Sequence, residues 1–349
     1  MNLVYKFFHQ FILFTVLLSF GFTTLSSLEK NQPYFVGELG PAWQFPSDHL
    51  PIGITLGSFH IAFWNTLNKD YLYHIQANTQ GLRDSSILRD NIQIDSDSPL
   101  TVRELITANI ILEMINHPTH PRSLIALQET NANLQNFLTE QIPLGWKIAT
   151  PLNQPISQDL FLYDSAIFNL IAIDSVLYTE TTPKSIFTLT LEEKATGKIF
   201  RFLQSHIPGG PINSKGGCEK FSTEALRQFD RSLTIVLMGD MNQSPDVIHN
   251  VLTTASNAAG LLNSPYTYLP IDYPSHMNTH TQASWIDHFF IYSADAELVI
   301  KKSDYPQEIS SQLVPIIQLL NSSRHLEDQE QDIQANIPDS VEAVFLPSS

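Results

Sequence analysis

Apolar and polar residues follow one another in short blocks through the middle of the chain, in a manner typical of β-strands. The runs 52–56 (IGITL) and 59–64 (FHIAFW) are separated by a Gly-Ser pair, which predicts two neighbouring strands joined by a tight turn. The blocks 185–193 and 198–206 flank a turn with the sequence Ala-Thr-Gly, and they predict a second hairpin. The pattern therefore indicates several antiparallel strand pairs.

Helical periodicity and fully apolar strands occur between these pairs. Segment 101–116 places its apolar residues on one face, which predicts a helix. The uninterrupted apolar run at 124–127 is typical of a strand that is buried on both faces, and IVLMGD at 235–240 repeats this pattern up to its polar end. Helices that cover interior strands, together with antiparallel pairs, indicate an α+β domain in which two sheets pack face to face with the helices outside.

The N-terminal residues have the features of an export segment. Lys6 precedes the apolar stretch 11–22, and small residues follow it. This order predicts a cleaved signal peptide over residues 1–27 or, as the alternative, a retained N-terminal membrane anchor. Residues 28–46 contain several prolines and glycines and are interpreted as a linker. We therefore expect an exported protein, secreted or periplasmic, and this N-terminal segment is a candidate for membrane contact.

One large domain is expected after the linker, over residues 47–302. The chain has 349 residues, of which 43% are hydrophobic, and this suits a single sizeable core with short extensions. Residues 303–349 are interpreted as a C-terminal helical extension and an acidic tail. Cys218 is the one cysteine, so stability must come from packing rather than from an intrachain disulfide.

The chain is acidic, with a formal net charge of −16 at pH 7. This charge disfavours binding to nucleic acid through electrostatic attraction alone. Divalent cations bound in a carboxylate-lined cleft would, however, invert the local field. Net charge therefore does not decide the class of substrate.

Polar side chains occur where the apolar strands end, at positions where they leave the core and can converge on one cleft. An acidic residue at a single strand end is usually just solvated, so the joint pattern carries more weight than any one residue. The residues concerned are Asn65, Glu129, His206, Asp240, Asn242 and Asp287.

Six short motifs together resemble those of the endonuclease/exonuclease/phosphatase superfamily. They are WN at 64–65, LQE at 127–129, SH at 205–206, GDMNQSPD at 239–246, WIDHFF at 285–290 and SDHLPI at 47–52. That superfamily includes type I deoxyribonucleases, abasic-site endonucleases, inositol polyphosphate 5-phosphatases and neutral sphingomyelinases. The resemblance extends over residues 47–293 and implies a deoxyribonuclease I-like four-layer α/β/β/α sandwich with two packed mixed sheets.

The SDHLPI motif comes at the opposite end of the domain from its place in the superfamily, where it follows the Ile-Asp-aromatic strand. We interpret this as a circular permutation, which is tolerated where the original termini lie close together. The alternative is that Ser303-Asp304-Tyr305-Pro306 is the usual motif with its histidine lost. Because tyrosine cannot replace imidazole near neutral pH, the two interpretations differ on whether His49 belongs to the site.

The resemblance implies a site for Mg²⁺, or for Mn²⁺ in its place. Hard cations of this kind take oxygen ligands and neutralise the charge on phosphoryl oxygens during phosphodiester hydrolysis. By the resemblance, Glu129 is the first metal ligand, Asp48 is a second-metal or outer-shell ligand, and Asn65 lies close by.

The resemblance also implies catalytic roles. Asp240 would orient the attacking water or accept its proton, and Asn242 would donate to a phosphate oxygen. His49, oriented by the Asp287 carboxylate, would act as general base or as a donor in the transition state. His206 matches the general acid of the deoxyribonuclease and sphingomyelinase branches.

Three further histidines lie near these motifs. His288 occupies the place of the superfamily's usual tyrosine and is interpreted as a core residue or as a support for the site. His276 and His280 belong to a segment predicted to be a loop, where we expect them to be solvated, with contact to the substrate as the alternative.

These features predict an exported metal-dependent phosphodiesterase that acts by in-line attack of water. The Gly-rich segment 208–220 is expected to be a loop, and it carries Lys215 and Lys220 as a basic pair near His206. Lys215 is assigned to substrate binding, and two lysines suit one phosphate better than a long strand. The substrate stays open between nucleic acid, a phospholipid head group and a small phosphodiester, and so does the oligomeric state. The alternative function is a binding module that keeps the fold without the activity.

Overall fold

The computed structural model of the chain describes residues 47, 49–66, 102–151, 158–179, 184–209, 211–261, 263–271, 275–279 and 282–302. The chain divides into the units Met1–Phe35 and Val36–Ser349, and all described residues belong to the second unit. The predicted signal peptide, the linker, Asp48, His280 and the C-terminal extension with its Ser-Asp-Tyr-Pro sequence lie outside the described residues. No helix in the described part of the chain is both long and apolar enough to cross a membrane.

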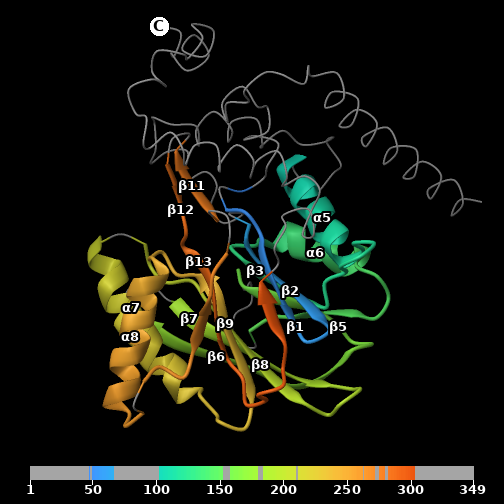
Figure 1. Cartoon of the computed structure of the whole chain (residues 1–349). Coiled ribbons are helices and arrows are strands. Elements are labelled where there is room, and N and C mark those ends of the chain that lie inside the picture. Colours follow the sequence, from blue (N-terminus) through green and yellow to red (C-terminus); the bar gives the residue numbers. More distant parts are fainter. Residues whose placement is uncertain are drawn as a thin grey trace, which may run out of the picture. The chain divides into compact units, whose positions relative to one another are not determined.

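Two six-stranded sheets form the centre of the described structure (Figure 1). The first sheet has the strand order β14-β1-β2-β3-β5-β4, with β1 (Ile52–Leu56), β2 (Phe59–Asn65), β3 (Leu124–Gln128), β4 (Trp146–Ala149), β5 (Leu160–Asp164) and β14 (Ile300–Lys302). The second sheet has the order β10-β13-β9-β8-β7-β6, with β6 (Phe168–Thr179), β7 (Lys184–Glu193), β8 (Ile199–Ser205), β9 (Thr234–Asp240), β10 (Thr267–Leu269) and β13 (Asp287–Tyr292). A separate pair consists of β11 (His276–Thr279) and β12 (Gln282–Ser284).

Each sheet is mixed and contains one parallel pair. Strands β2 and β3 are parallel in the first sheet, as are β8 and β9 in the second, and the remaining neighbours are antiparallel. The sheets pack against each other through aromatic side chains, for example Phe161 of β5 and Phe187 of β7, whose ring centroids are 5.0 Å apart. This interface buries residues of both sheets in one apolar core.

Helices lie beside both sheets. The described helices are α5 (Val102–Ile115), α6 (Ala132–Gln141), α7 (Pro211–Arg227) and α8 (Pro245–Ala258). Figure 1 shows α5 and α6 next to the first sheet and α7 and α8 next to the second. The predicted α+β fold, with two packed mixed sheets and helices outside, is therefore confirmed.

Both hairpins predicted from the sequence are confirmed. Strands β1 and β2 pair antiparallel, and Gly57 between them has a φ of 62°. Strands β7 and β8 also pair antiparallel, and Gly197 in their turn has a φ of 70°. In both turns the backbone enters the left-handed region that glycine adopts without steric cost.

The Gly-rich segment after β8 was expected to be a loop, and this expectation is wrong. Residues 211–227 form helix α7, which begins with a proline, as helices often do. Gly217 packs so closely on Pro208 that a Cβ there would lie 2.9 Å from its Cδ, and Cys218 and Phe221 are buried. Burial of this face overrides the low helix propensity of glycine. Lys215 therefore lies on a helix, and its side chain is outside the described residues.

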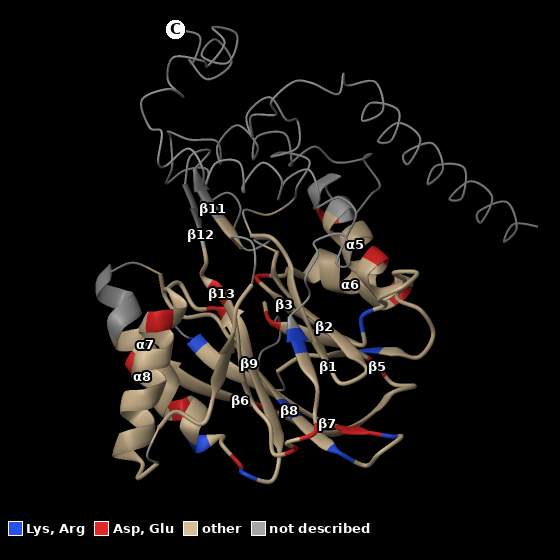
Figure 2. Ribbon diagram, viewed as in Figure 1, with Lys and Arg blue, Asp and Glu red and all other residues tan. Residues whose placement is uncertain are grey.

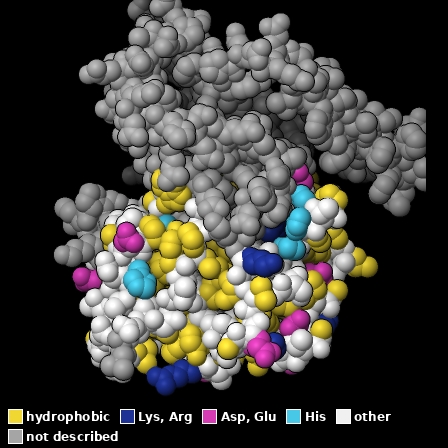
Figure 3. All heavy atoms as spheres, in the orientation of Figure 1, with side chains coloured by type: hydrophobic (Ala, Val, Ile, Leu, Met, Phe, Trp, Pro, Cys, Tyr) yellow, Lys and Arg dark blue, Asp and Glu magenta, His cyan; other side chains and the backbone are white. Residues whose placement is uncertain are grey.

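Three histidines meet at the end of β2 that lies opposite Asn65. The ring centroids of His60 and His120 are 5.1 Å apart, and those of His117 and His120 are 5.8 Å apart. Figure 3 shows histidine side chains at the surface of the molecule. Burial lowers the pKa of His60 to about 4, helped by the nearby Arg122, His120 and His117. The folded protein therefore keeps this imidazole neutral in mild acid.

This lowered pKa makes stability depend on pH. Between about pH 6.5 and pH 4 the unfolded chain binds a proton at His60 that the folded chain does not, so stability falls as the pH falls through this window. We expect the loss due to His60 to be about 1–2 kcal/mol, after discounting for solvent at the partly exposed ring. Urea denaturation at pH 6.5 and pH 4 should show a correspondingly smaller loss in His60→Gln than in the wild type. Equal losses would contradict the prediction.

Candidate active site

Polar residues from both sheets meet at one end of the sandwich. Asp240 ends β9 and Asp287 begins β13, and the two are directly paired because these strands are antiparallel. Asn65 ends β2 of the other sheet, and its Nδ2 donates to Asp240 Oδ2 at 3.1 Å. The chain thus brings three of the sequence-predicted site residues into one buried cluster from separate strands.

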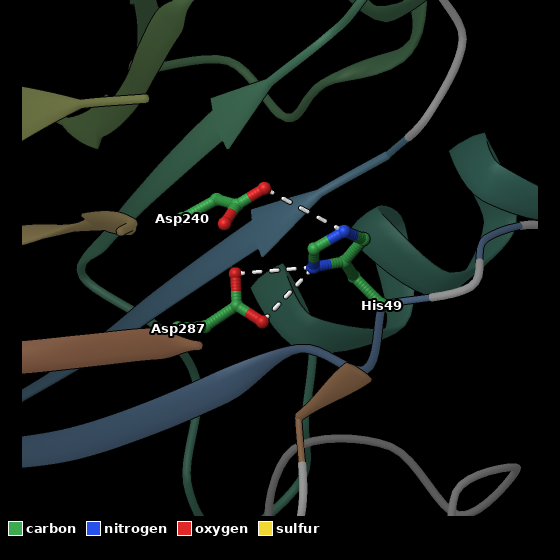
Figure 4. A group of neighbouring side chains, drawn as sticks. All are labelled: His49, Asp240 and Asp287. Carbon is green, nitrogen blue, oxygen red and sulfur yellow. Dashed lines mark hydrogen bonds and ion pairs between the residues drawn. The ribbon is translucent and has the colours of Figure 1, made fainter. Parts of the chain in front are cut away.

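The imidazole of His49 lies between two carboxyl groups (Figure 4). Its Nδ1 is 2.9 Å from Oδ2 and 3.2 Å from Oδ1 of Asp287, and its Nε2 is 3.6 Å from Oδ2 of Asp240. All three side chains are buried. His49 and Asp287 are 238 residues apart in the sequence, so this contact is made by the fold alone.

The segment before β1 is tied to the end of β2, and this fixes His49. The hydroxyl of Ser47 accepts from the backbone N–H of His49 at 3.0 Å and donates to the carbonyl of Asn65 at 2.7 Å. Trp64 Nε1 donates to the carbonyl of His49 at 2.9 Å. The Ser-x-His part of SDHLPI therefore docks on the Trp-Asn motif.

His206 lies near the same oxygen of Asp240 as His49 does. Its Nε2 is 3.5 Å from Asp240 Oδ2, and its Nδ1 is 3.2 Å from Glu129 Oε1. Carboxyl and imidazole groups consequently alternate along one line through the site. The order is Asp287, His49, Asp240, His206, Glu129.

Two site residues have backbone conformations that side chains other than glycine rarely adopt. Glu129 has a φ of 55° and Asn242 a φ of 49°, and no other non-glycine residue in the described part of the chain has a positive φ. Asn242 is held by its N–H to Asp240 Oδ1 at 3.0 Å and by its Nδ2 to the carbonyl of Ile207 at 2.8 Å. Strained backbone of this kind persists where the surroundings fix it, often at functional sites.

The chain resembles known proteins in structure but not detectably in sequence. No protein-family model and no curated protein matches the chain. A variant of D. rerio TDP2 humanised by 14 mutations matches with 12% identity and a TM-score of 0.47, covering 72% of this chain and 86% of TDP2. An endonuclease/exonuclease/phosphatase family protein from Bacteroides thetaiotaomicron has 13% identity and a TM-score of 0.45, with 73% and 92% covered. The human Nocturnin catalytic domain has 14% identity and a TM-score of 0.42, with 70% and 82% covered.

The two packed mixed sheets with helices beside them match the sandwich that the sequence motifs implied. At these identities the likeness concerns the arrangement of strands and helices alone.

Burial and charge act in opposite directions at the central groups. Burial alone would lower the pKa of His49, but the carboxylates of Asp287 and Asp240 outweigh it and raise the pKa to about 9. Burial raises the pKa of Asp240 to about 7, although the His49 charge opposes this. Without a bound cation, His49 is therefore an imidazolium at neutral pH, and Asp240 is poised to exchange a proton.

Asp287 is the group that keeps His49 charged. In Asp287→Asn we expect the pKa of His49 to fall by more than one unit, because burial would then face only the charge of Asp240 and more distant acids. A pH titration of the imidazole NMR signals in metal-free protein measures this. Asp295→Asn, which removes a partly exposed carboxylate paired with Lys198, should leave the signal of His49 unchanged. An unshifted His49 in Asp287→Asn would contradict the assignment.

The residues present fit a divalent cation. Glu129 Oε2 is buried and has no hydrogen-bond partner among the described residues, as expected of an oxygen that awaits a metal ion. His49, Asp240 and Asp287 also place one ligand atom each within 4.8 Å of one another. The site therefore offers two places for a cation: the Glu129 carboxylate, and the group of one histidine and two aspartates around His49. Asp48, the predicted second ligand, is outside the described residues.

His276 was expected to be a solvated loop residue, and this expectation is wrong. It begins β11, is buried, and lies with its ring centroid 4.5 Å from that of His49. Local sequence carries no signal for this position, because His276 is placed by its bridge to His49 and by the pairing of β11 with β12. The neighbouring Ser275 hydroxyl accepts from the N–H of Asp287 at 3.1 Å and supports the pair.

His288 is a core residue, as predicted. It is fully buried, and its Nε2 donates to the carbonyl of Gln243 at 2.7 Å. Burial lowers the pKa of His288, so this imidazole stays neutral. Its contact holds the loop after Asn242 against β13.

Proposed function

We propose that this chain is a divalent-metal-dependent phosphodiesterase. The observation that carries the proposal is the line of alternating carboxyl and imidazole groups from Asp287 to Glu129, which five separate segments contribute. A line of this kind offers a cation ligand at one end and proton donors and acceptors along its length. His49, Asp240 and Asp287 are buried at the end of the sandwich, and His206 and Glu129 are partly exposed beside them. Sites built on the ends of strands maintain their geometry well.

Each group has a role that follows from its position. Glu129 would hold Mg²⁺ or Mn²⁺, which when bound neutralises the phosphoryl oxygens. Asp240 accepts a proton from the water whose oxygen attacks phosphorus. His49, charged and oriented by Asp287, donates a hydrogen bond to a phosphoryl oxygen. His206 gives a proton to the oxygen that leaves as the phosphorus–oxygen bond breaks.

The order of the chain supports a circular permutation. Strand β1 follows His49 directly and pairs with β2 through a tight turn at Gly57. His49 reaches Asp287 from this N-terminal position. We infer that the SDHLPI strand was transferred from the end of the domain to its start without loss of the site. Export through residues 1–27, by a cleaved signal or a retained anchor, belongs to the same proposal.

The substrate that we propose presents one phosphodiester rather than a long polyanion. Described Lys and Arg residues are spread over the ribbon rather than gathered at the site (Figure 2). Strong binding of a nucleic-acid backbone normally needs several cationic contacts. Two solved structures with this fold differ in their ligands: D. rerio TDP2 is complexed with a single-strand DNA product, and another is a mannosyl-6-phosphatase of Bacteroides thetaiotaomicron.

One set of assays tests the function. The full chain, purified in a mild detergent, should hydrolyse bis-p-nitrophenyl phosphate with Mg²⁺ or Mn²⁺ and stop when a chelator is added. Sphingomyelin and plasmid DNA in parallel reactions identify the class of substrate. If no phosphoester is hydrolysed with any divalent cation, the enzymatic proposal fails, and a binding module with this fold is the better explanation.

A further inference from the structure

Two glutamines reach across between the sheets directly beneath the candidate site. Gln128 ends β3 in the first sheet, and its Oε1 accepts from the backbone N–H of Asp240 in the second sheet at 3.2 Å. Gln204 of β8 reaches in the opposite direction, and its Nε2 donates to the carbonyl of Leu127 at 2.6 Å. Neither side chain is exposed to solvent. The sheets are thus cross-linked twice, once from each side.

These cross-links are not explained by stability. Gln128 Nε2 and Gln204 Oε1 are buried and have no hydrogen-bond partner among the described residues. A buried amide that uses half of its hydrogen-bonding capacity costs stability, and the space between the sheets is otherwise lined by apolar side chains. Leucine or methionine at these positions would remove the two unpaired groups, at the cost of the two hydrogen bonds between the sheets. Polar groups in this setting therefore point to a constraint other than the stability of the fold.

Both glutamines lie next to residues of the candidate site. Gln128 is followed directly by Glu129, whose backbone is strained. Gln204 precedes His206 by two residues, and Asp240 is the group that both imidazoles approach. The sheets supply different parts of the site, with Glu129 on the first and Asp240 and His206 on the second. Any sliding of one sheet on the other would change the distances along the line.

We propose that Gln204 and Gln128 are positioning residues that fix the separation of Glu129 from Asp240 and His206 across the two sheets. The catalytic part of this inference rests on the proposed phosphodiesterase function. The structural part does not, because it concerns the mobility of the site in the metal-free chain. Neither glutamine is assigned a contact with substrate or with the reacting atoms.

The test replaces each amide by a side chain of similar size without hydrogen-bonding groups. In Gln204→Met and Gln128→Met we expect the amide hydrogen of Asp240 to exchange at least tenfold faster, measured by NMR on the metal-free full chain. We also expect kcat for bis-p-nitrophenyl phosphate to fall by 10- to 100-fold, while KM changes less than threefold, because only the alignment of the reacting groups is lost. The double variant should be little worse than the poorer single variant, since the two residues act as one unit.

Ser256→Ala is the matched control. Ser256 of α8 is also buried, and its hydroxyl also has no hydrogen-bond partner among the described residues, but it does not bridge the sheets. This variant should leave both the exchange of Asp240 and kcat unchanged. An unchanged exchange rate in Gln204→Met overturns the proposal whatever happens to activity. Faster exchange in the two glutamine variants, in a protein whose wild type hydrolyses no phosphoester, would support the positioning role and count against the phosphodiesterase function instead.

Discussion

Replacing His49 by alanine is expected to lower kcat for phosphodiester hydrolysis by about 10²- to 10⁴-fold, the usual contribution of a positioned acid or base. The variant removes the charged donor between Asp287 and Asp240 and leaves two buried carboxyl groups facing each other without the imidazolium. Steady-state kinetics on bis-p-nitrophenyl phosphate measure the effect. KM should change little, because the lost interaction belongs to the transition state.

Two controls make this result specific. His120→Ala removes a histidine from the cluster at the other end of β2 and should leave kcat within a factor of two. Asp304→Ala removes the acid of the C-terminal Ser-Asp-Tyr-Pro sequence and should be equally harmless. If Asp304→Ala abolishes turnover and His49→Ala does not, the site is completed by the C-terminal sequence, and the circular permutation is wrong.

Glu129→Gln is expected to weaken Mn²⁺ binding at least tenfold and to lower kcat by about 100-fold or more, since metal ions contribute several kcal/mol to catalysis of this kind. The substitution keeps the size of the side chain and removes the charge that a hard cation needs. Titration monitored by Mn²⁺ electron paramagnetic resonance measures affinity without reference to activity.

The matched control for this variant is Glu140→Gln, which neutralises an exposed glutamate in α6. Its Mn²⁺ affinity and its kcat should equal those of the wild type. If Glu129→Gln binds Mn²⁺ as tightly as the wild type, Glu129 is not a ligand of the cation. The cluster of His49, Asp240 and Asp287 would then be the next site to test.

Much of the fold follows from local patterns in the sequence. Fully apolar runs predicted the interior strands β3 and β9, and turn glycines predicted the hairpins on either side of Gly57 and Gly197. These features depend on neighbours in sequence, which is why periodicity reveals them. Helix α7 was missed because its glycines and proline hide a helical period that packing on Pro208 and burial of Phe221 maintain.

The candidate site was predictable only in part. The acids at strand ends were visible as polar residues after apolar runs, but the contact between His49 and Asp287 was inferred from resemblance, since no spacing rule spans 238 residues. His276 and Gln204 gave no signal. The position of His276 depends on the short strand pair β11–β12, and the contact of Gln204 depends on the distance between the two sheets. Local sequence patterns predict neither.

The position of His49 at the front of the domain affects how the protein is made. During synthesis this residue leaves the ribosome early, and its partner Asp287 follows only after 238 more residues. Contacts between such distant positions form slowly, because a long loop must close first. A nascent or truncated chain therefore has no complete site, and hydrolytic activity can arise only after almost the whole domain has been translated.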